Sequence, residues 1–204
     1  MWINGLRYRH FRSPRSGVVK VHLGPGQSNY LDGWINVDAN MFTARCDVWS
    51  DLRNKLPFRA SSVDAFYSHH VIEHLPNLGF HLHELYRCLK PGGVFRIGGP
   101  NGDSAIKKFI QGDIEWFDDF PRRWQSVGGR FDNFILCRNE HLTILTLSFL
   151  SELTSIAGFK IIKPVLPATE TQFPHFFDSA VLSREWERTP ECPHTLLIEG
   201  QKPQ

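Results

Sequence analysis

Residues 18–38 constrain the fold of this chain more than any other stretch. The run 18–21 is rich in β-branched residues, which is typical of a buried parallel strand. Gly24 and Gly26 follow, and glycine lets the backbone turn sharply and lets a ligand approach the main chain closely. A second apolar run then ends at Asp38. The stretch predicts two strands joined through a glycine turn, and an ordinary turn without a ligand is the alternative interpretation.

Asp38 stands at the end of the second predicted strand, where a carboxylate can accept two hydrogen bonds from a ribose. A dinucleotide site fits less well, because Asn29 replaces the third glycine of that fingerprint. Asp38 also follows Gly26 by 12 residues, whereas ~20 are typical of a dinucleotide fold. The connection from Gly26 to Trp34 is too short for an ordinary parallel crossover. We therefore expect the first helix to be reduced to about one turn or replaced by a loop.

The composition limits the class of protein. At 204 residues the chain is long enough for one substantial domain. Its formal net charge of +2 predicts no general attraction to nucleic acid or to a membrane surface. No apolar run reaches the ~20 residues of a membrane span. The four cysteines form no Cys-x-x-Cys pair, which is typical of a reduced, cytoplasmic protein.

The first 17 residues form a separate basic segment. They contain four arginines and no acidic residue. Such a start resembles a transit peptide but contains little serine. We interpret residues 1–17 as a surface arm on the edge of the sheet, and residues 18–204 as a single domain.

Strands and helices alternate along the rest of the chain. Strands are expected at 44–49, 62–68, 94–97, 160–163 and 195–199, and amphipathic helices at 77–89 and 146–157. In the second helix the residues expected to face inward are Leu147, Leu150, Leu153 and Ile156. Residues 104–138 are too aromatic for a disordered linker, and we interpret them as a partly helical lid insert. This order predicts an α/β fold with a doubly wound, mainly parallel sheet.

Two segments near the C-terminus carry no recognisable motif, and we interpret them from composition alone. The aromatic run 173–177 is predicted to be an apolar patch that covers the site or meets a partner. The charged residues Arg184, Glu185, Glu187 and Arg188 are interpreted as ordinary surface charges.

Ligands of α/β sheets bind at the carboxyl ends of the parallel strands. Residues of the right kind follow several predicted strands: Gly24, Gly26, Asp38, Asp51, Ser68, His69, His70 and Asn101. Their convergence on one edge of the sheet is a stronger indication of a site than any single motif.

Together these motifs resemble the class I S-adenosylmethionine-dependent methyltransferases, in particular compact, type 11-like members with a short first crossover. The segments that carry the resemblance are 22–26, 34–38, 51–58, 64–75, 85–93 and 157–159. It covers residues 18–101 well and 141–200 loosely. The resemblance implies a Rossmann-like sheet of seven strands with an antiparallel last strand, and S-adenosylmethionine as the cofactor.

The resemblance also implies which residues bind that cofactor: His22, Leu23, Gly24, Pro25, Gly26, Asp38, Ala39, Asp51, Leu52, Ser68 and His69. Main-chain amides at Gly24 and Gly26 are expected to meet the methionine carboxylate. Asp38 is expected to hold the ribose, and the Asp51 region to hold the adenine. The expected acceptor is a hydroxyl of a small molecule or glycan, which needs a base. The candidate bases are His69 or His70, and His141; of these, His70 and His141 are our predicted catalytic residues.

The histidine-rich segment that begins at His70 allows a metal-based alternative. His70-x-x-Glu73-His74 matches an inverted zinc-peptidase pattern, although Pro76 follows closely and His70 comes directly after a strand. Methyltransferases that act on ubiquinone precursors or small-RNA ends resemble the segment more closely. There Glu-x-x-Glu-His binds a divalent metal; His70 stands at the first Glu, and His141 is a further candidate ligand.

We expect no metal at this segment. In the preferred interpretation Glu73 and His74 cap the start of the next helix and His70 lines the pocket. Three other functions stay open beside the methyltransferase: a protein that binds the cofactor without transfer, an NAD-dependent oxidoreductase, and a zinc hydrolase.

Overall fold

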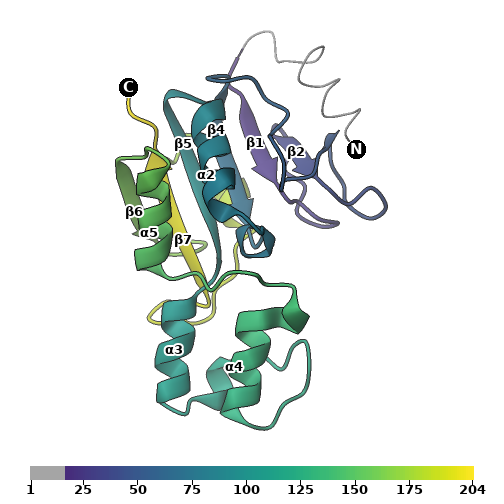
Figure 1. Ribbon diagram of the computed structural model, residues 1–204, viewed down its shortest axis with the longest axis vertical. Coiled ribbons are helices and arrows are strands. Elements are labelled where there is room, and N and C mark those ends of the chain that lie inside the picture. The colour runs from purple at the N-terminus through teal and green to yellow at the C-terminus, as the bar shows by residue number, and fades with distance from the viewer. Residues whose placement is uncertain (1–16) are drawn as a thin grey trace.

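The computed structural model describes residues 17–204, so the predicted basic arm lies outside the described residues except for Gly17. Seven strands form one sheet in the order β3-β2-β1-β4-β5-β7-β6 (Figure 1). They are β1 Lys20–Leu23, β2 Ile35–Asp38, β3 Val48–Trp49, β4 Val63–His69, β5 Leu89–Pro100, β6 Ile161–Val165 and β7 Thr195–Gln201. Strands β1 to β5 pair in parallel, and β7 runs antiparallel to both β5 and β6. The predicted Rossmann-like sheet with an antiparallel last strand is confirmed.

Helices connect and flank these strands: η1 Ile72–His74, α2 Leu78–Cys88, α3 Gly102–Ile110, η2 Ile114–Trp116, α4 Val127–Leu136, η3 Cys137–Asn139, α5 Leu147–Ile156 and α6 Ser179–Leu182. Helix α2 begins after Asn77, whose side chain accepts a hydrogen bond from the Phe80 amide. Thr146 caps α5 in the same way, on the Phe149 amide. Both predicted helices therefore exist close to their expected ends. Within the described residues, no helix is long and apolar enough to cross a membrane.

The first crossover is a loop, as its length predicted. No helix forms between β1 and β2. The strand expected at 44–49 is reduced to Val48–Trp49. The Asn40 side chain holds a turn just before it by accepting from the Phe42 and Thr43 amides. The Arg45 amide donates to the Gly26 carbonyl at 2.9 Å, and residues 44–47 are irregular backbone.

Ile156 was predicted to face inward, and this is wrong: it is 63% exposed, whereas Leu150 is fully buried. Each step of three residues falls about 60° short of a full helical turn. Two such steps carry Ile156 away from the buried face of α5. Leu147 and Leu153, one step to either side of Leu150, pack against the core as partly buried residues.

Two apolar clusters cover the two faces of the sheet. The larger one lies between the sheet and helices α2 and α5, which stand in front of the sheet in Figure 1. On the other face, Leu31 and Trp34 from the first crossover pack with Tyr67, Phe177 and Val181. Phe177 is fully buried. The aromatic run 173–177 therefore completes the core where a crossover helix is missing, which corrects its interpretation as a patch over the site.

A buried ion network ties residues 183–199 to the centre of the sheet. The Arg96 guanidinium donates two hydrogen bonds to Glu185, at 2.7 and 2.6 Å, and one to Glu199 at 2.6 Å. All three side chains are fully buried. Glu187 is also buried and lies 2.9 Å from Nδ1 of His194. The interpretation of Glu185 and Glu187 as surface charges is wrong, because the charge pattern of the sequence does not reveal that Glu185 pairs with Arg96 and Glu187 with His194.

Residues 102–139 form a separate layer beyond the carboxyl end of β5 (Figure 1). Its small core contains Ala105, Trp116, Phe117 and Ile135. The layer is attached to the sheet through Trp116, whose indole N–H donates to the Cys192 carbonyl at 2.9 Å. The insert is partly helical, as predicted. Its action as a lid stays a prediction.

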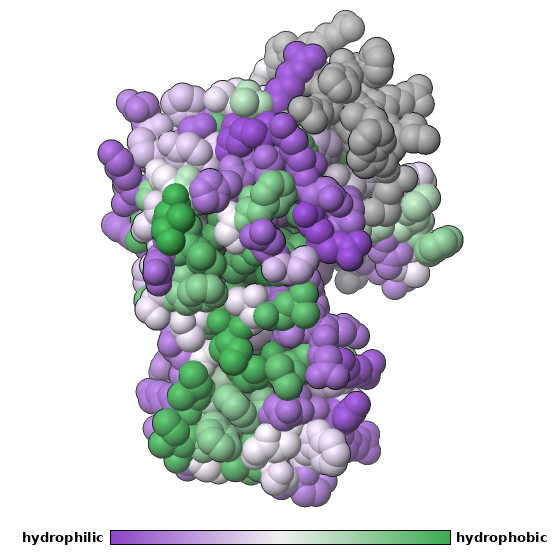
Figure 2. Space-filling view, viewed as in Figure 1, coloured by the Kyte–Doolittle hydropathy of each residue, from purple (hydrophilic) through white to green (hydrophobic). Residues whose placement is uncertain are grey.

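Part of the surface of this layer is apolar. Figure 2 shows hydrophobic side chains gathered over α3, where Ile106, Phe109 and Ile110 are exposed.

Candidate active site

Two neighbouring cavities open at the carboxyl ends of the strands. We call the first the β1–β2 cavity; its volume is about 340 Å³, and it is lined by Gly24, Gly26, Asp38, Ala39, Asp51, Leu52, Arg53, His70, Val71, His74 and Leu75. The second, the β7 cavity, measures about 440 Å³ and is lined by residues 24–29, His69, His70, Asp118, Phe134, Arg184, Trp186, His194 and Thr195. Gly24, Gly26 and His70 line both, so the two cavities are adjoining parts of one site.

The glycine turn has a left-handed geometry that favours glycine. Gly24 and Gly26 have φ values of +73° and +56°. A Cβ atom on Gly24 would lie 2.2 Å from Cγ2 of Val71, whereas one on Gly26 would meet no atom within 4 Å. Gly24 therefore permits close packing of the turn against Val71, and Gly26 leaves open space beside both cavities.

The amides of these two glycines already have partners. The Gly24 amide donates to the Val37 carbonyl at 2.8 Å, and the Gly26 amide donates to Oδ2 of Asp38 at 3.0 Å. Both amides are therefore occupied, and their contact with the methionine carboxylate stays a prediction. Within residues 17–204, the amides of Gln27 and Ser28 make no hydrogen bond, and both residues line the β7 cavity. These two amides are better placed to receive an anionic group.

Asp38 is held rigidly at the edge of the β1–β2 cavity. Its Oδ2 accepts from Gly26 and its Oδ1 accepts from the Asn40 amide at 2.8 Å. Each carboxylate oxygen keeps a further lone pair for a ligand hydroxyl. Asp51 pairs with Arg53 at 2.8 Å, and this hydrogen bonding lowers the pKa of Asp51. Ala39, Asp51 and Leu52 all line the cavity, as a cofactor site would require.

Three of the predicted cofactor residues line neither cavity. His22 is buried, and its Nδ1 lies 3.1 Å from Oδ1 of Asn36. Burial lowers the pKa of His22 to about 4, so its ring is neutral at physiological pH. Leu23 and Ser68 are fully buried within the layers of the fold. These three residues support the turn and β4 from inside, and their direct contact with the cofactor stays a prediction.

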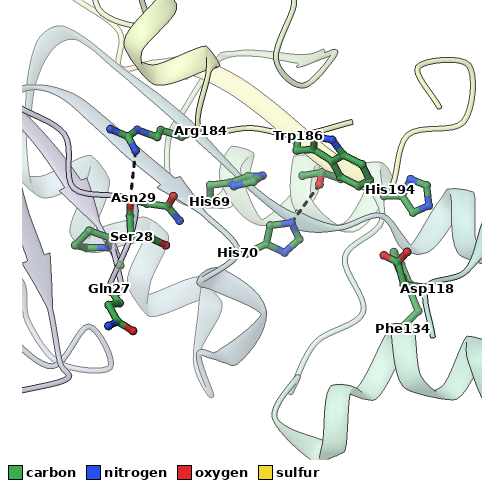
Figure 3. Close-up of a pocket in the computed structure, with 14 residues that line it drawn as sticks. Gln27, Ser28, Asn29, His69, His70, Asp118, Phe134, Arg184, Trp186 and His194 are labelled. Atoms are coloured by element: carbon green, nitrogen blue, oxygen red, sulfur yellow. Dashed lines mark hydrogen bonds between the residues drawn. The ribbon is translucent and has the colours of Figure 1, made fainter. Parts of the chain in front are cut away.

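His70 stands where the two cavities meet. Its backbone adopts a left-handed φ of +55°, which is uncommon for a residue other than glycine. Its Nδ1 lies 3.3 Å from Oε1 of Glu73, and its Nε2 lies 3.2 Å from the Thr195 hydroxyl (Figure 3). A carboxylate only accepts, so Nδ1 carries the proton and Nε2 keeps a lone pair. Glu73 is buried and orients the imidazole.

The β7 cavity is assembled from distant segments. Figure 3 shows His69 and His70 between the first crossover on one side and Trp186, His194 and Asp118 on the other. Arg184 donates to the carbonyls of Ser28 and Tyr30, at 3.3 and 3.1 Å. Burial, then the neighbouring His70, lowers the pKa of His69.

Sequence reasoning missed nine residues of the β7 cavity. Three of them, Gln27, Ser28 and Asn29, continue the glycine turn, and six come from distant segments: Asp118, Phe134, Arg184, Trp186, His194 and Thr195. Nothing in their local sequence indicated that they would meet. The nearest signal was the aromatic content of residues 104–138, which predicted a covering layer but no individual contact.

His141 lies away from both cavity linings, in a cluster with Glu73 and His74. One possible ligand atom from each lies within 4.8 Å of the others. The rings of His74 and His141 are 4.9 Å apart, and burial lowers the pKa of His141. The interpretation of Glu73 and His74 as a helix cap is wrong: η1 has no side-chain cap, and Asn77 caps α2.

Comparison with known proteins supplies the context for this geometry. A family model described as "Methyltransferase domain" matches residues 21–97. No curated protein matches the chain. A solved S-adenosylmethionine-dependent methyltransferase from Thermotoga maritima, a possible histamine N-methyltransferase, is similar with a TM-score of 0.59 at 18% identity, covering 98% of this chain and 88% of that one.

Two further solved structures show the same fold. A putative methyltransferase of Haloferax volcanii, in complex with the Trm112 methyltransferase activator, gives a TM-score of 0.57 at 16% identity over 100% of this chain and 90% of that one. A Haemonchus contortus phosphoethanolamine N-methyltransferase bound to S-adenosylhomocysteine gives 0.54 at 15% identity over 100% of this chain and 53% of that one.

Proposed function

We propose that this chain, whose residues 21–97 match a methyltransferase-domain model and whose fold is that of solved S-adenosylmethionine-dependent methyltransferases, is a class I methyltransferase that methylates a hydroxyl oxygen of a small molecule or glycan. It is therefore an enzyme whose cofactor is S-adenosylmethionine. The observation that supports the hydroxyl acceptor is the position of His70, which lines both cavities and keeps a lone pair on Nε2. The scattered cysteines support a cytoplasmic location.

The residues of the β1–β2 cavity fit the cofactor chemically. The fixed carboxylate of Asp38 suits a ribose diol, and the apolar side chains of Leu52, Val71 and Leu75 suit an adenine ring. The unpartnered amides of Gln27 and Ser28, which line the adjoining β7 cavity beside the glycine turn, suit the methionine carboxylate. When bound, the cofactor supplies a methyl group that its sulfonium already activates. The protein then has to aim an acceptor atom at that methyl group in line.

His70 is proposed to be the catalytic base. A hydroxyl must lose its proton as its oxygen is methylated, and a base within hydrogen-bond reach takes that proton. Nε2 of His70 now contacts the Thr195 hydroxyl, and an acceptor hydroxyl would replace this contact. Glu73 holds the ring in the tautomer that leaves Nε2 free to accept.

The β7 cavity is the proposed acceptor site. It combines the Asp118 carboxylate, which accepts hydroxyl hydrogen bonds, with the Trp186 indole, which is 65% exposed. An exposed indole offers a flat apolar face to a ring. A polar ring compound, such as a sugar, satisfies both features.

An amine acceptor is the second candidate. The Thermotoga neighbour is described as a possible histamine N-methyltransferase, and the Haemonchus neighbour acts on phosphoethanolamine. An amine needs a base only to reach its neutral form, so the position of His70 favours the hydroxyl.

The first experiment is a thermal-shift titration with S-adenosylhomocysteine, with NAD as the control. A hundredfold excess over the dissociation constant should stabilise the fold by ~2.7 kcal/mol. Wild type should shift with S-adenosylhomocysteine alone. A shift with NAD alone would contradict the cofactor assignment and favour an oxidoreductase.

The second experiment follows a labelled methyl group from S-adenosylmethionine into a panel of sugars, phenols and amines. An O-methyl product that depends on His70, and is lost in His70→Gln, supports the proposal. An N-methyl product would overturn the choice of acceptor atom. Cofactor binding without any product would favour a binding protein.

A further inference from the structure

His69 and His70 are consecutive residues whose rings line the same cavity. Successive side chains of a strand point to opposite faces, so a residue that continued β4 would point away from His69. The left-handed φ of +55° at His70 breaks this alternation directly after the strand. Both side chains line the β7 cavity, and their ring centroids lie 4.4 Å apart (Figure 3). The unusual backbone of His70 therefore accompanies the meeting of two imidazoles in one cavity.

His69 has no hydrogen-bond partner among residues 17–204. Its Nε2 is enclosed by protein and unsatisfied. Its Nδ1 makes no hydrogen bond either, but this atom is not enclosed, so it faces the β7 cavity that the ring lines. The Tyr67 ring stacks on His69 at 6.4 Å and holds the plane of the imidazole. An oriented ring nitrogen without a protein partner is available to a ligand of that cavity.

The proton of His69 belongs on Nδ1. Burial, then the neighbouring His70, lowers the pKa of this ring, so at physiological pH it carries one N–H and one lone pair. An enclosed N–H without an acceptor is rarer in proteins than an unmet lone pair. The enclosed Nε2 therefore keeps the lone pair, and Nδ1 directs its N–H into the cavity. His69 is thus a donor, whereas Nε2 of His70 is an acceptor because Nδ1 of that ring donates to Glu73.

On the premise of the proposed function, we propose that this donor–acceptor pair selects the substrate: a ring hydroxyl whose neighbouring carbon carries a second oxygen. Nε2 of His70 accepts from the hydroxyl that is methylated, and Nδ1 of His69 donates to the neighbouring oxygen. That oxygen can belong to a hydroxyl, an ether or a carbonyl, because each of these accepts a hydrogen bond. His69 is then a specificity-determining residue on the acceptor side, which differs from the cofactor contact that the family resemblance implies.

Other groups beside the hydroxyl suit His69 less well. An ammonium group offers only donors, and these would meet the N–H of His69. A carboxylate would leave water for a neutral ring that offers no charge, and Arg184, which lines the same cavity, already donates to the Ser28 and Tyr30 carbonyls. An alkyl group would leave the N–H without a partner. An uncharged oxygen satisfies the donor at no such cost.

The two histidines have separate parts in the transfer. The acceptor oxygen forms its bond to the methyl carbon as the bond between that carbon and sulfur breaks, and its proton passes to Nε2 of His70. The positive charge of the cofactor is lost, and the imidazolium of His70 gains it beside the buried Glu73. His69 exchanges no proton. It holds the second oxygen and so fixes which hydroxyl faces the methyl group.

The test compares substrates that differ by one oxygen, using the purified full chain and a labelled methyl group. Catechol is paired with ortho-cresol, guaiacol with ortho-ethylphenol, and methyl glucoside with the deoxy analogue that lacks a neighbouring hydroxyl. In each phenol pair a carbon of similar size replaces the oxygen. The oxygen-bearing member should have the higher kcat/KM by about 10-fold, the effect of one hydrogen bond. A preference in the phenols alone assigns an aromatic acceptor, and one in the glucosides alone assigns a sugar.

A variant identifies the donor. His69→Phe keeps a ring and removes the N–H, so the preference for oxygen should disappear. A merely structural role of His69 would lower both members of a pair alike and leave the preference unchanged. His83→Phe is the matched control, because this exposed histidine of α2 lines neither cavity, and it should keep the preference. Both variants should bind S-adenosylhomocysteine as wild type does, which also shows that they fold.

The outcomes separate this inference from the proposed function. Equal kcat/KM within every pair in wild type, or a preference that survives in His69→Phe, would overturn the inference and leave the methyltransferase intact. A preference for catechol without one for guaiacol would show that His69 accepts rather than donates, and would overturn it too. No affinity for S-adenosylhomocysteine in wild type, or no O-methyl product from any of these compounds, would overturn the proposed function itself.

Discussion

The β1–β2 cavity and the β7 cavity meet at His70, but the chain builds them differently. The first is lined by residues between Gly24 and Leu75, at the ends of consecutive strands. The second joins six separate stretches between Gly24 and Thr195. Asp38 in the first is fixed by two nearby backbone amides. The comparison teaches that a cofactor-side cavity can depend on local backbone geometry, whereas an acceptor-side cavity depends on contacts across the whole fold.

The most sensitive of those long-range contacts is the Arg96 network. Arg96→Met should lower the free energy of unfolding by about 3–5 kcal/mol, because Glu185 and Glu199 would remain buried without their cation. Urea denaturation measures the change. Lys108→Met, which removes the more exposed pair with Asp113, should change it by less than about 1 kcal/mol. If the two substitutions lowered the free energy of unfolding equally, the buried Arg96 network would contribute no more to stability than the more exposed Lys108–Asp113 pair.

The free energy of unfolding should decrease as the pH falls. Two buried histidines, in the half of the molecule that carries the β1–β2 cavity, contribute to this decrease. Burial lowers the pKa of His22 and of His81 from 6.5 to about 4. As the pH drops through this window, the unfolded chain binds protons that the folded chain does not, so the folded state loses stability. At pH 4 the loss should be about 3 kcal/mol for each histidine.

Urea denaturation between pH 8 and pH 4 measures this loss. His81→Gln should make the slope below pH 6.5 shallower without removing it, because His22, His69 and His141 also have lowered pKa values and still titrate. An unchanged slope in this variant would show that His81 is protonated equally in the folded and unfolded chain.

Asp38→Ala should weaken binding of S-adenosylhomocysteine by about 100-fold or more, since two hydrogen bonds to a charged group are lost. Calorimetry measures the affinity. Asp132→Ala removes an exposed carboxylate of α4 and serves as the control. If both variants bind like wild type, Asp38 does not hold the ribose and the β1–β2 cavity is not the cofactor site.

Trp186→Ala should raise the KM for the acceptor by about 3–10-fold, as expected for losing one aromatic contact. Affinity for S-adenosylhomocysteine should not change, because Trp186 lines the β7 cavity alone. Phe42→Ala removes an aromatic side chain that is 96% exposed and lines neither cavity. A change in cofactor affinity with Trp186→Ala would contradict the division of the site.

The sequence-based expectations succeeded where the physical cause is local. Gly24 could be recognised because a left-handed turn after a strand needs glycine, and the structure adds the close approach of Val71. The helix predicted at 77–89 agrees with α2 to within one residue at each end, and the structure adds that the Asn77 side chain caps its first turn. Ile156 was misplaced because a three-residue spacing drifts around a helix.

Expectations failed where a side chain depends on a partner far along the chain. From its local sequence, Glu185 is predicted to be a surface charge, whereas in the structure it is buried beside Arg96 of β5. From their local sequence, Glu73 and His74 are predicted to cap a helix, whereas in the structure they lie beside His141 and cap no helix. The local sequence of such residues is the same whether the partner is present or absent.

By itself, the sequence determined the order of strands and helices, the glycine turn and the acid at Asp38. These features depend on backbone conformation and on the periodicity of apolar side chains, and residues close together in the sequence set both. Only the tertiary structure decided that Asp118, Trp186 and His194 share a cavity with His70, and that His141 lies beside Glu73. Such contacts form only when the whole sheet and its flanking layers have packed, because packing alone brings distant segments together.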